Sequence, residues 1–102
     1  MGEIEIIWSP EARARFEEIY NYLWEKWSLR VANNFKEETL SQVDLLALYP
    51  YMGIPIEYRL DLYKRLLTSH NYLYYLIHDG RIIIIDIIDT RQEPATSDKE
   101  DE

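Results

Sequence analysis

Polar and apolar residues alternate in the first segment of the chain. Residues 3–8 run Glu-Ile-Glu-Ile-Ile-Trp, which places Ile6 and Trp8 on the same face of an extended segment. The alternation stops at Ser9, whose hydroxyl can cap a helix, and Pro10 has the fixed backbone angle that suits a first helical position. The sequence therefore predicts a half-buried strand that leads directly into a helix.

Two segments with helical periodicity follow. Apolar residues recur at spacings of three and four from Pro10 to about Lys26, and again from Ser28 to the stop at Tyr49 and Pro50. Each segment has a polar face opposite its apolar stripe, as amphipathic helices do. Because so few residues separate the two helices, we expect them to form an antiparallel hairpin.

The C-terminal half predicts three antiparallel strands. Segment 50–58 contains two prolines and a glycine, which break both periodicities, and is predicted to be a loop. Asp79 and Gly80 are typical of a tight type I′ hairpin turn. The predicted strands span residues 63–68, 72–78 and 81–89.

The order of elements predicts an α+β fold. It consists of an N-terminal strand, an antiparallel helical hairpin and a three-stranded antiparallel meander, which form one sheet with the helices on one face. Strand 81–89 is apolar on both faces, since strict alternation would separate two sets: Ile83, Ile85 and Ile87 from Ile82, Ile84 and Ile88. The helices can cover only one set. The other is expected to need cover from loop 50–58, the tail or another chain.

Composition limits the classes of protein that the chain can represent. Its 102 residues, 47% of them hydrophobic, predict one domain over 1–93 and an acidic solvated tail over 94–102. The chain has no cysteine, metal-ligand spacing or glycine-rich phosphate loop, so we expect neither metal nor cofactor. The apolar runs are shorter than the ~20 residues that cross a bilayer, and the N-terminus does not resemble a signal peptide. We therefore expect a cytoplasmic protein without a membrane partner.

The charge distribution is unfavourable for a protein that binds phosphates over a broad surface. Eleven Lys and Arg residues against 19 Asp and Glu residues give a net charge of −8. Residues 54–93 are nearly balanced, with five cations and six anions. Proteins that bind nucleic acid by neutralising many phosphates usually present a basic field, which this sequence lacks.

Several short motifs occur in an order that is typical of one family. The motifs are Ile7-Trp8-Ser9-Pro10-Glu11-Ala12, Ala32 with Phe35, Tyr49-Pro50-Tyr51-Met52-Gly53, Arg65-Leu66-Leu67, Tyr72-Leu73-Tyr74-Tyr75 and Asp89-Thr90-Arg91-Gln92-Glu93-Pro94. In these motifs the chain resembles the RelE/ParE superfamily of bacterial type II toxin–antitoxin toxins. The resemblance implies a growth-inhibiting toxin of a plasmid stabilisation or addiction module. It also implies an oligomeric complex with a cognate antitoxin that wraps the toxin.

The resemblance leaves two activities to be separated. RelE-like members cleave mRNA on the ribosome without a metal, using cations with a Tyr or His on the open sheet face. The matching candidates are Lys64, Arg65, Arg91, Tyr75 (or Tyr74) and His70. ParE-like members instead inhibit DNA gyrase without catalysis. A third possibility is a non-toxic remnant that only binds the antitoxin.

Three features favour the ParE-like activity slightly. The chain is acidic, its closing motif lacks the His-Tyr or Tyr-rich ending of several active nucleases, and Asp86 and Asp89 lie close to Arg91 in sequence. Asp86 is expected to pair with Lys64, Arg65 or an antitoxin cation, because an unpaired carboxylate among isoleucines would be costly. Lys64 and Arg65 are adjacent on a strand, so at most one can be catalytic.

The predicted surface for the antitoxin or the target is the uncovered face of the last strand. We expect it to comprise Ile82, Ile84, Ile88 and Arg81.

Overall fold

The computed structural model describes residues 4–89, which fold into two long helices beside a five-stranded sheet. The elements in chain order are β1 (Glu5–Trp8), α1 (Pro10–Lys26), α2 (Leu29–Leu48), the 3-10 helix η1 (Pro50–Met52), β2 (Ile54–Pro55), β3 (Leu62–Thr68), β4 (Asn71–His78) and β5 (Arg81–Asp89). The predicted α+β class is confirmed. The predicted tail over 94–102 lies outside the described residues and stays a prediction.

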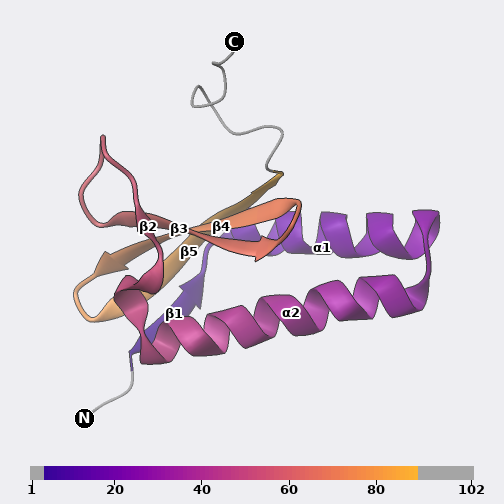
Figure 1. Cartoon of the computed structure of the whole chain (residues 1–102), viewed down its shortest axis with the longest axis horizontal. Coiled ribbons are helices and arrows are strands. Elements are labelled where there is room, and N and C mark those ends of the chain that lie inside the picture. Colours follow the sequence, from indigo (N-terminus) through magenta and orange to yellow (C-terminus); the bar gives the residue numbers. More distant parts are fainter. Residues whose placement is uncertain (1–3, 90–102) are drawn as a thin grey trace.

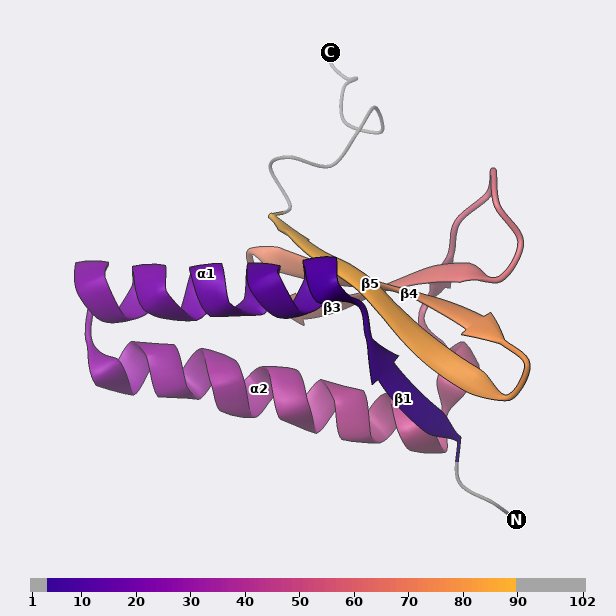
Figure 2. The ribbon, with the colours of Figure 1, turned by 180° about the vertical axis from the view of Figure 1, so that it is seen from behind.

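The sheet has the strand order β1-β5-β4-β3-β2. β1 pairs in parallel with β5, and the other neighbours pair antiparallel. Figures 1 and 2 show the helical hairpin on one face of this sheet and the connection between its helices at one end of the molecule. The β3–β4 turn reaches over the hairpin. Within residues 4–89, neither helix combines the length and the hydropathy that a bilayer crossing requires.

Both predicted helix starts are confirmed by their hydrogen bonds. The Ser9 hydroxyl accepts from the Ala12 amide (3.0 Å) and donates to the Ile85 carbonyl (2.8 Å). The Ser28 hydroxyl accepts from the Val31 amide at 3.1 Å. Ser9 thus caps α1 and also attaches its first turn to β5, a contact between residues that are 76 positions apart in the sequence.

Segment 50–58 contains more structure than the predicted loop. Pro50 opens η1, and Ile54 and Pro55 pair with Lys64 and Tyr63 as the edge strand β2. A proline is compatible with an edge strand because the amide that it lacks can face away from the ladder. The prediction of a structureless loop was wrong for this reason: prolines break helices and central strands but permit short edge elements.

A β-bulge in β5 changes which isoleucines are buried. Tyr74 pairs with Asp86 and Tyr75 with Ile84, so Ile85 is an extra residue that no partner opposes. Beyond it the alternation shifts by one. Three isoleucines therefore face the helices and are completely buried: Ile82, Ile84 and Ile87. The prediction that Ile82 and Ile84 lie on the open face was wrong, because the helices cover the face that these two residues share, and the bulge places Ile88 on the opposite face.

The core lies between the helical hairpin and the helix-facing side of the sheet. Besides the three isoleucines it contains Ala12, Val43, Leu46, Leu67, Leu73 and Tyr75. Phe16 of α1 and Phe35 of α2 stack with ring centroids 5.4 Å apart, which joins the two helices. The opposite face of the sheet bears Lys64, Leu66, Tyr72, Tyr74, Leu76, Ile83 and Ile88.

Candidate functional site

The predicted catalytic cations on β3 point to opposite faces of the sheet. Lys64 lies on the open face, with its ammonium 4.4 Å from the centroid of the Tyr72 ring. Arg65 faces the helices, where its Nε donates to the Gln42 side chain at 2.9 Å. A charge over an aromatic face and a guanidinium bonded to a helix both have ordinary structural roles. The two adjacent cations thus lie on opposite faces of the sheet, as expected for neighbours on a strand.

Tyr75 is buried and its hydroxyl is fully engaged. The hydroxyl donates to the Pro50 carbonyl at 2.8 Å and accepts from the Gly53 amide at 3.1 Å. Burial raises the pKa of Tyr75 above its ordinary value of 10.0. A phenol that is neutral, enclosed and bonded at both ends cannot serve as a general base, so Tyr75 anchors the segment around η1 instead.

The remaining predicted catalytic and binding residues are spread over the molecule. His70 is exposed in the β3–β4 turn, where its amide donates to the Thr68 hydroxyl. Arg81 lies beyond the other end of β4, roughly 23 Å away along an eight-residue strand, and pairs with Glu5 at 3.1 Å. Arg91 lies outside the described residues. Among the candidates in residues 4–89, Lys64 and Tyr74 are register partners on the open face, whereas the other catalytic candidates lie elsewhere. Within the same residues, no cluster of His, Asp and Glu suits a metal ion.

Ile88 is the one member of the predicted isoleucine surface that remains on the open face. It is half-buried and lies opposite Tyr72. Since Ile82 and Ile84 are enclosed by the chain's own helices, they are not available to a partner in this conformation. The open face therefore has Ile83 and Ile88 where the prediction placed Ile82, Ile84 and Ile88.

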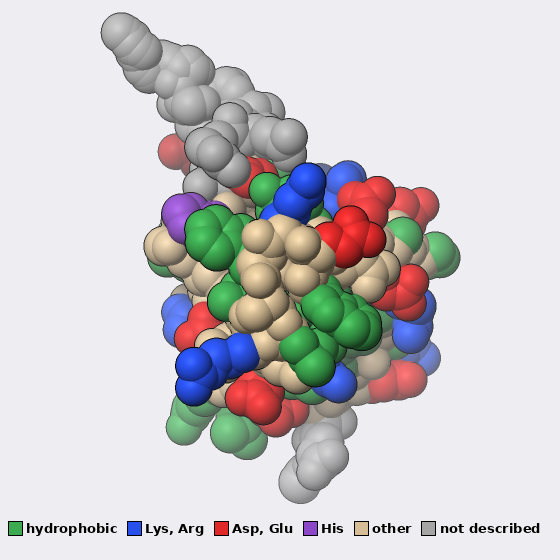
Figure 3. Space-filling model, turned by 90° about the vertical axis from the view of Figure 1, so that its right-hand side faces the viewer, with side chains coloured by type: hydrophobic (Ala, Val, Ile, Leu, Met, Phe, Trp, Pro, Cys, Tyr) green, Lys and Arg blue, Asp and Glu red, His purple; other side chains and the backbone are tan. Residues whose placement is uncertain are grey.

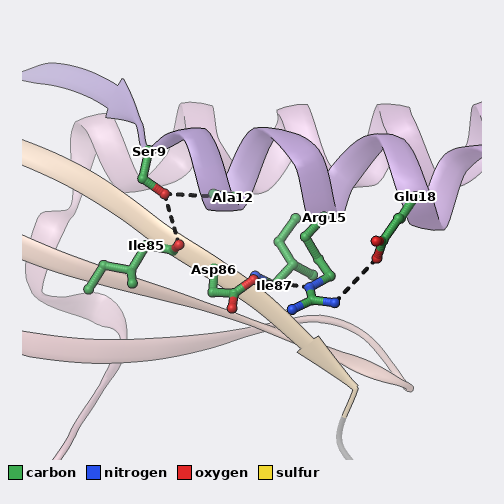
Figure 4. A network of polar contacts seen from close by, with 7 residues as sticks. All are labelled: Ser9, Ala12, Arg15, Glu18, Ile85, Asp86 and Ile87. Carbon is green, nitrogen blue, oxygen red and sulfur yellow. Dashed lines mark hydrogen bonds and ion pairs between the residues drawn. The ribbon is translucent and has the colours of Figure 1, made fainter.

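Asp86 pairs with a residue of α1 (Figure 4). Its carboxylate accepts from the Arg15 guanidinium at 3.3 Å and from the Ile87 amide at 2.8 Å, and Arg15 also contacts Glu18. The hydrogen bond and charge of Asp86 raise the pKa of Arg15. The expected pairing of Asp86 with Lys64 or Arg65 was wrong, because the bulge brings the carboxylate to the edge of β5, beside α1.

Two grooves flank the β3–β4 turn. The α2 groove, of about 590 Å³, has an apolar lining of Leu23, Val31 and Phe35 with Glu37 and Glu38 beside it. The α1 groove, of about 630 Å³, is lined by Ile19, Leu23, Tyr22, Trp27 and Ile87, with Arg15, Glu18 and Asp89. Leu23, His70 and Asn71 belong to both grooves. The turn thus separates two grooves that combine apolar residues with polar ones, and their charged residues are four carboxylates and the guanidinium of Arg15.

Exposed aromatic side chains cluster at the tip of the helical hairpin. Figure 3 looks onto this end of the molecule, where hydrophobic side chains emerge among charged ones. The large apolar side chains of this tip are between 47% and 71% exposed and comprise Tyr22, Trp24, Trp27 and Leu29. Tyr22 and Trp27 also border the α1 groove, so its apolar lining continues onto the tip. Sequence periodicity missed Trp27 as a surface candidate, since it follows Leu23 at a spacing of four that also fits a core-facing stripe.

The sequence of this chain matches one family of known proteins. Residues 6–94 match the model of a family described as the ParE toxin of the type II toxin–antitoxin system parDE. Toxin ParE1 of two Mycobacterium tuberculosis strains is 26% identical over 86 residues, which cover 83% of this chain and 88% of the relative.

Solved structures extend the similarity to the fold. A chain of the chromosomal ParDE system from P. aeruginosa aligns with a TM-score of 0.72 at 18% identity, over 84% of this chain and 95% of that one. A YoeB/ParE toxin from Agrobacterium tumefaciens aligns with a TM-score of 0.62 at 14% identity, over 83% and 96%. The sequence match and the shared architecture lead to one conclusion: this chain belongs to the ParE toxin family of type II toxin–antitoxin systems.

Proposed function

We propose that this protein is the growth-inhibiting toxin of a plasmid stabilisation module, neutralised in the cytoplasm by a cognate antitoxin, and that it acts by binding DNA gyrase. The observation that supports binding over catalysis is the dispersal of most of the predicted catalytic groups, since only Tyr74 lies opposite Lys64 on the open face among those that the structure describes. Lys64 lies on one face of the sheet, Arg65 and Tyr75 face the other, and His70 lies in a turn. RNA cleavage requires a base and cations within hydrogen-bond reach of one phosphate.

The charge of the chain supports the same proposal. A net charge of −8 would repel the phosphates of mRNA, whereas contact with a protein target needs no basic field. RelE-like cleavage on the ribosome is the alternative, and the two activities make different predictions for Lys64. Among the cations that the structure describes, Lys64 is the one on the open face that matches the nuclease pattern.

Expression of the wild-type toxin alone is expected to stop growth, and co-expression of its antitoxin to restore it. Purified toxin should inhibit gyrase supercoiling and leave ribosome-bound mRNA intact. Lys64→Ala should retain full toxicity, because the proposed activity does not use Lys64 as a catalytic group. Cleavage of mRNA in the ribosomal A site, abolished by Lys64→Ala, would instead establish the RelE-like activity.

The two grooves beside the β3–β4 turn suit the antitoxin best. Their apolar lining would take the nonpolar side chains of an extended or helical antitoxin segment. Their borders contain the carboxylates of Glu18, Glu37, Glu38 and Asp89. The complementary segment should therefore combine large apolar residues with Lys or Arg.

Trp27→Ala is expected to weaken antitoxin binding by roughly 10-fold or more, since exposed tryptophans at a groove edge are frequent hot spots. Trp27 is 71% exposed, so its removal should leave the fold intact. Trp24→Ala is the matched control, because Trp24 lies on the same tip but lines neither of the two grooves. Calorimetric titration with purified antitoxin measures both. Equal affinities for the two variants would contradict this placement of the antitoxin.

A further inference from the structure

The end of the molecule opposite the hairpin tip bears a second apolar surface. Six large side chains between positions 48 and 60 are at least half exposed: Leu48, Tyr49, Tyr51, Ile54, Tyr58 and Leu60. They belong to the end of α2, to η1, to β2 and to the loop that follows it. Figures 1 and 2 show this loop projecting from the sheet on the side away from the connection between the helices.

The tip of this surface, residues 56–61, is hereafter the knob. Tyr58 is 79% and Leu60 86% exposed, the highest values among the large hydrophobic residues that the structure describes. Neither side chain stabilises the fold by burial. Clustered exposed apolar residues are uncommon on monomeric proteins and mark sites of association.

Backbone hydrogen bonds fix the shape of the knob. The Ile56 amide donates to the Leu62 carbonyl at 2.9 Å, and the Arg59 amide donates to the Ile56 carbonyl at 3.2 Å. At its end, the Asp61 carbonyl accepts from the Ile77 amide at 3.0 Å, which ties the knob to β4. Asp61 has φ of 73°, a left-handed conformation that a non-glycine residue adopts at some cost. A braced loop that presents Tyr58 and Leu60 loses little conformational entropy on binding.

We infer that the knob inserts Tyr58 and Leu60 into a concave apolar pocket of the toxin's target protein. This inference rests on the proposed function, because it names the surface through which the toxin acts. Tyrosine is enriched among the residues that dominate interface energies, and a projecting tip requires a hollow counterpart. Glu57 and Asp61 flank the two apolar side chains, whereas Arg59 is the one cation in the knob. The target pocket should therefore have a predominantly basic border.

A second copy of this chain offers a poor receiving surface for the knob. The α1 and α2 grooves are hollow surfaces with apolar residues, and their borders contain Glu18, Glu37, Glu38 and Asp89. The carboxylates of Glu57 and Asp61 would face these like charges, and the repulsion would disfavour a contact between the knob and a groove of a second copy. Nucleic acid is disfavoured for the same reason.

The knob is separate from the grooves assigned to the antitoxin. No residue of 48–61 lines either groove, so the two surfaces share no described side chain. Variants of the knob should therefore separate toxicity from antitoxin binding. This separation is the property that the experiment uses.

The test compares a double variant, Tyr58→Gln with Leu60→Gln, with the control Leu40→Gln. Leu40 is 44% exposed on α2 and lines neither groove, so the control removes an exposed apolar side chain elsewhere. The double variant is expected to inhibit purified target roughly 100-fold less strongly than wild type and to lose growth inhibition. Its affinity for the antitoxin should stay within about twofold of wild type, as should that of Leu40→Gln.

The other outcomes overturn the inference in distinguishable ways. If wild type is toxic and the double variant is equally toxic, the knob does not contact the target, and the proposed function is unaffected. Loss of antitoxin binding by the double variant would make the knob part of the antitoxin surface. A wild-type dimer in sedimentation that the double variant dissociates would make the knob a contact between copies. A wild-type toxin without any effect on growth would refute the proposed function itself, and the target assignment with it.

Discussion

Replacement of Gly53 by alanine is expected to lower the unfolding free energy by about 2–4 kcal/mol, since it combines overpacking with the loss of a buried hydrogen bond. A Cβ at this position would fall on the Tyr75 hydroxyl and lie 2.9 Å from the Lys64 carbonyl oxygen. The backbone of β3 cannot retreat, because both of its neighbours hold it in the sheet. The hydrogen bond from the Gly53 amide to Tyr75 would be lost as the segment shifts.

Denaturant unfolding measures this effect, with Gly80→Ala as its control. Gly80 has φ of +74° and open space around its Cβ position, so its replacement should cost only about 1 kcal/mol of backbone strain. In a double-mutant cycle, Gly53→Ala and Tyr75→Phe should be strongly non-additive, because both disrupt the same contact. Additive effects, or equal costs at Gly53 and Gly80, would show that the close approach to Tyr75 is not what constrains position 53.

Ile84→Ala is expected to destabilise the protein by about 2–5 kcal/mol, the usual range for emptying a core site of this size. Ile84 is fully buried beneath the helices and belongs to the central cluster. Its neighbour Ile83 is an ideal control, because it is chemically identical and adjacent, yet lies half-buried on the open face. Ile83→Ala should cost clearly less in the same thermal or denaturant unfolding experiment. A larger loss at position 83 would mean that the helices cover the other face.

Local signals in the sequence were sufficient for most of the architecture. Ser9 and Pro10 located the start of α1 because capping depends on a few neighbouring residues. The Asp79-Gly80 turn was equally local, and both residues have the positive φ that a type I′ turn needs. The register of β5 was different. Asp86 directly follows the extra residue Ile85, but a single polar residue in a run of isoleucines does not fix where the alternation shifts, so the bulge could not be located.

The surfaces were harder to predict than the elements. The family followed from ordered short motifs, but which side chains meet depends on contacts between distant residues. The Arg15–Asp86 pair joins positions 71 apart, and both grooves are lined by Leu23 together with the distant residues His70 and Asn71. The exposure of Tyr58 and Leu60 was invisible for a similar reason: a loop with apolar residues is as compatible with covering a core as with projecting from it.

The closed edge of β5 has a consequence for the protein in a crowded cell. β1 ends opposite Ile84, yet the Ile85 carbonyl is bonded to Ser9 and the Ile87 amide to the Asp86 carboxylate, with Arg15 beside them. A foreign strand approaching here would meet fixed charges and saturated backbone groups in place of a template for pairing. An isoleucine-rich strand of this kind is a hazard for fibril growth in an unprotected sheet. Because this edge of β5 is closed, the toxin should be able to accumulate without polymerising before an antitoxin binds it.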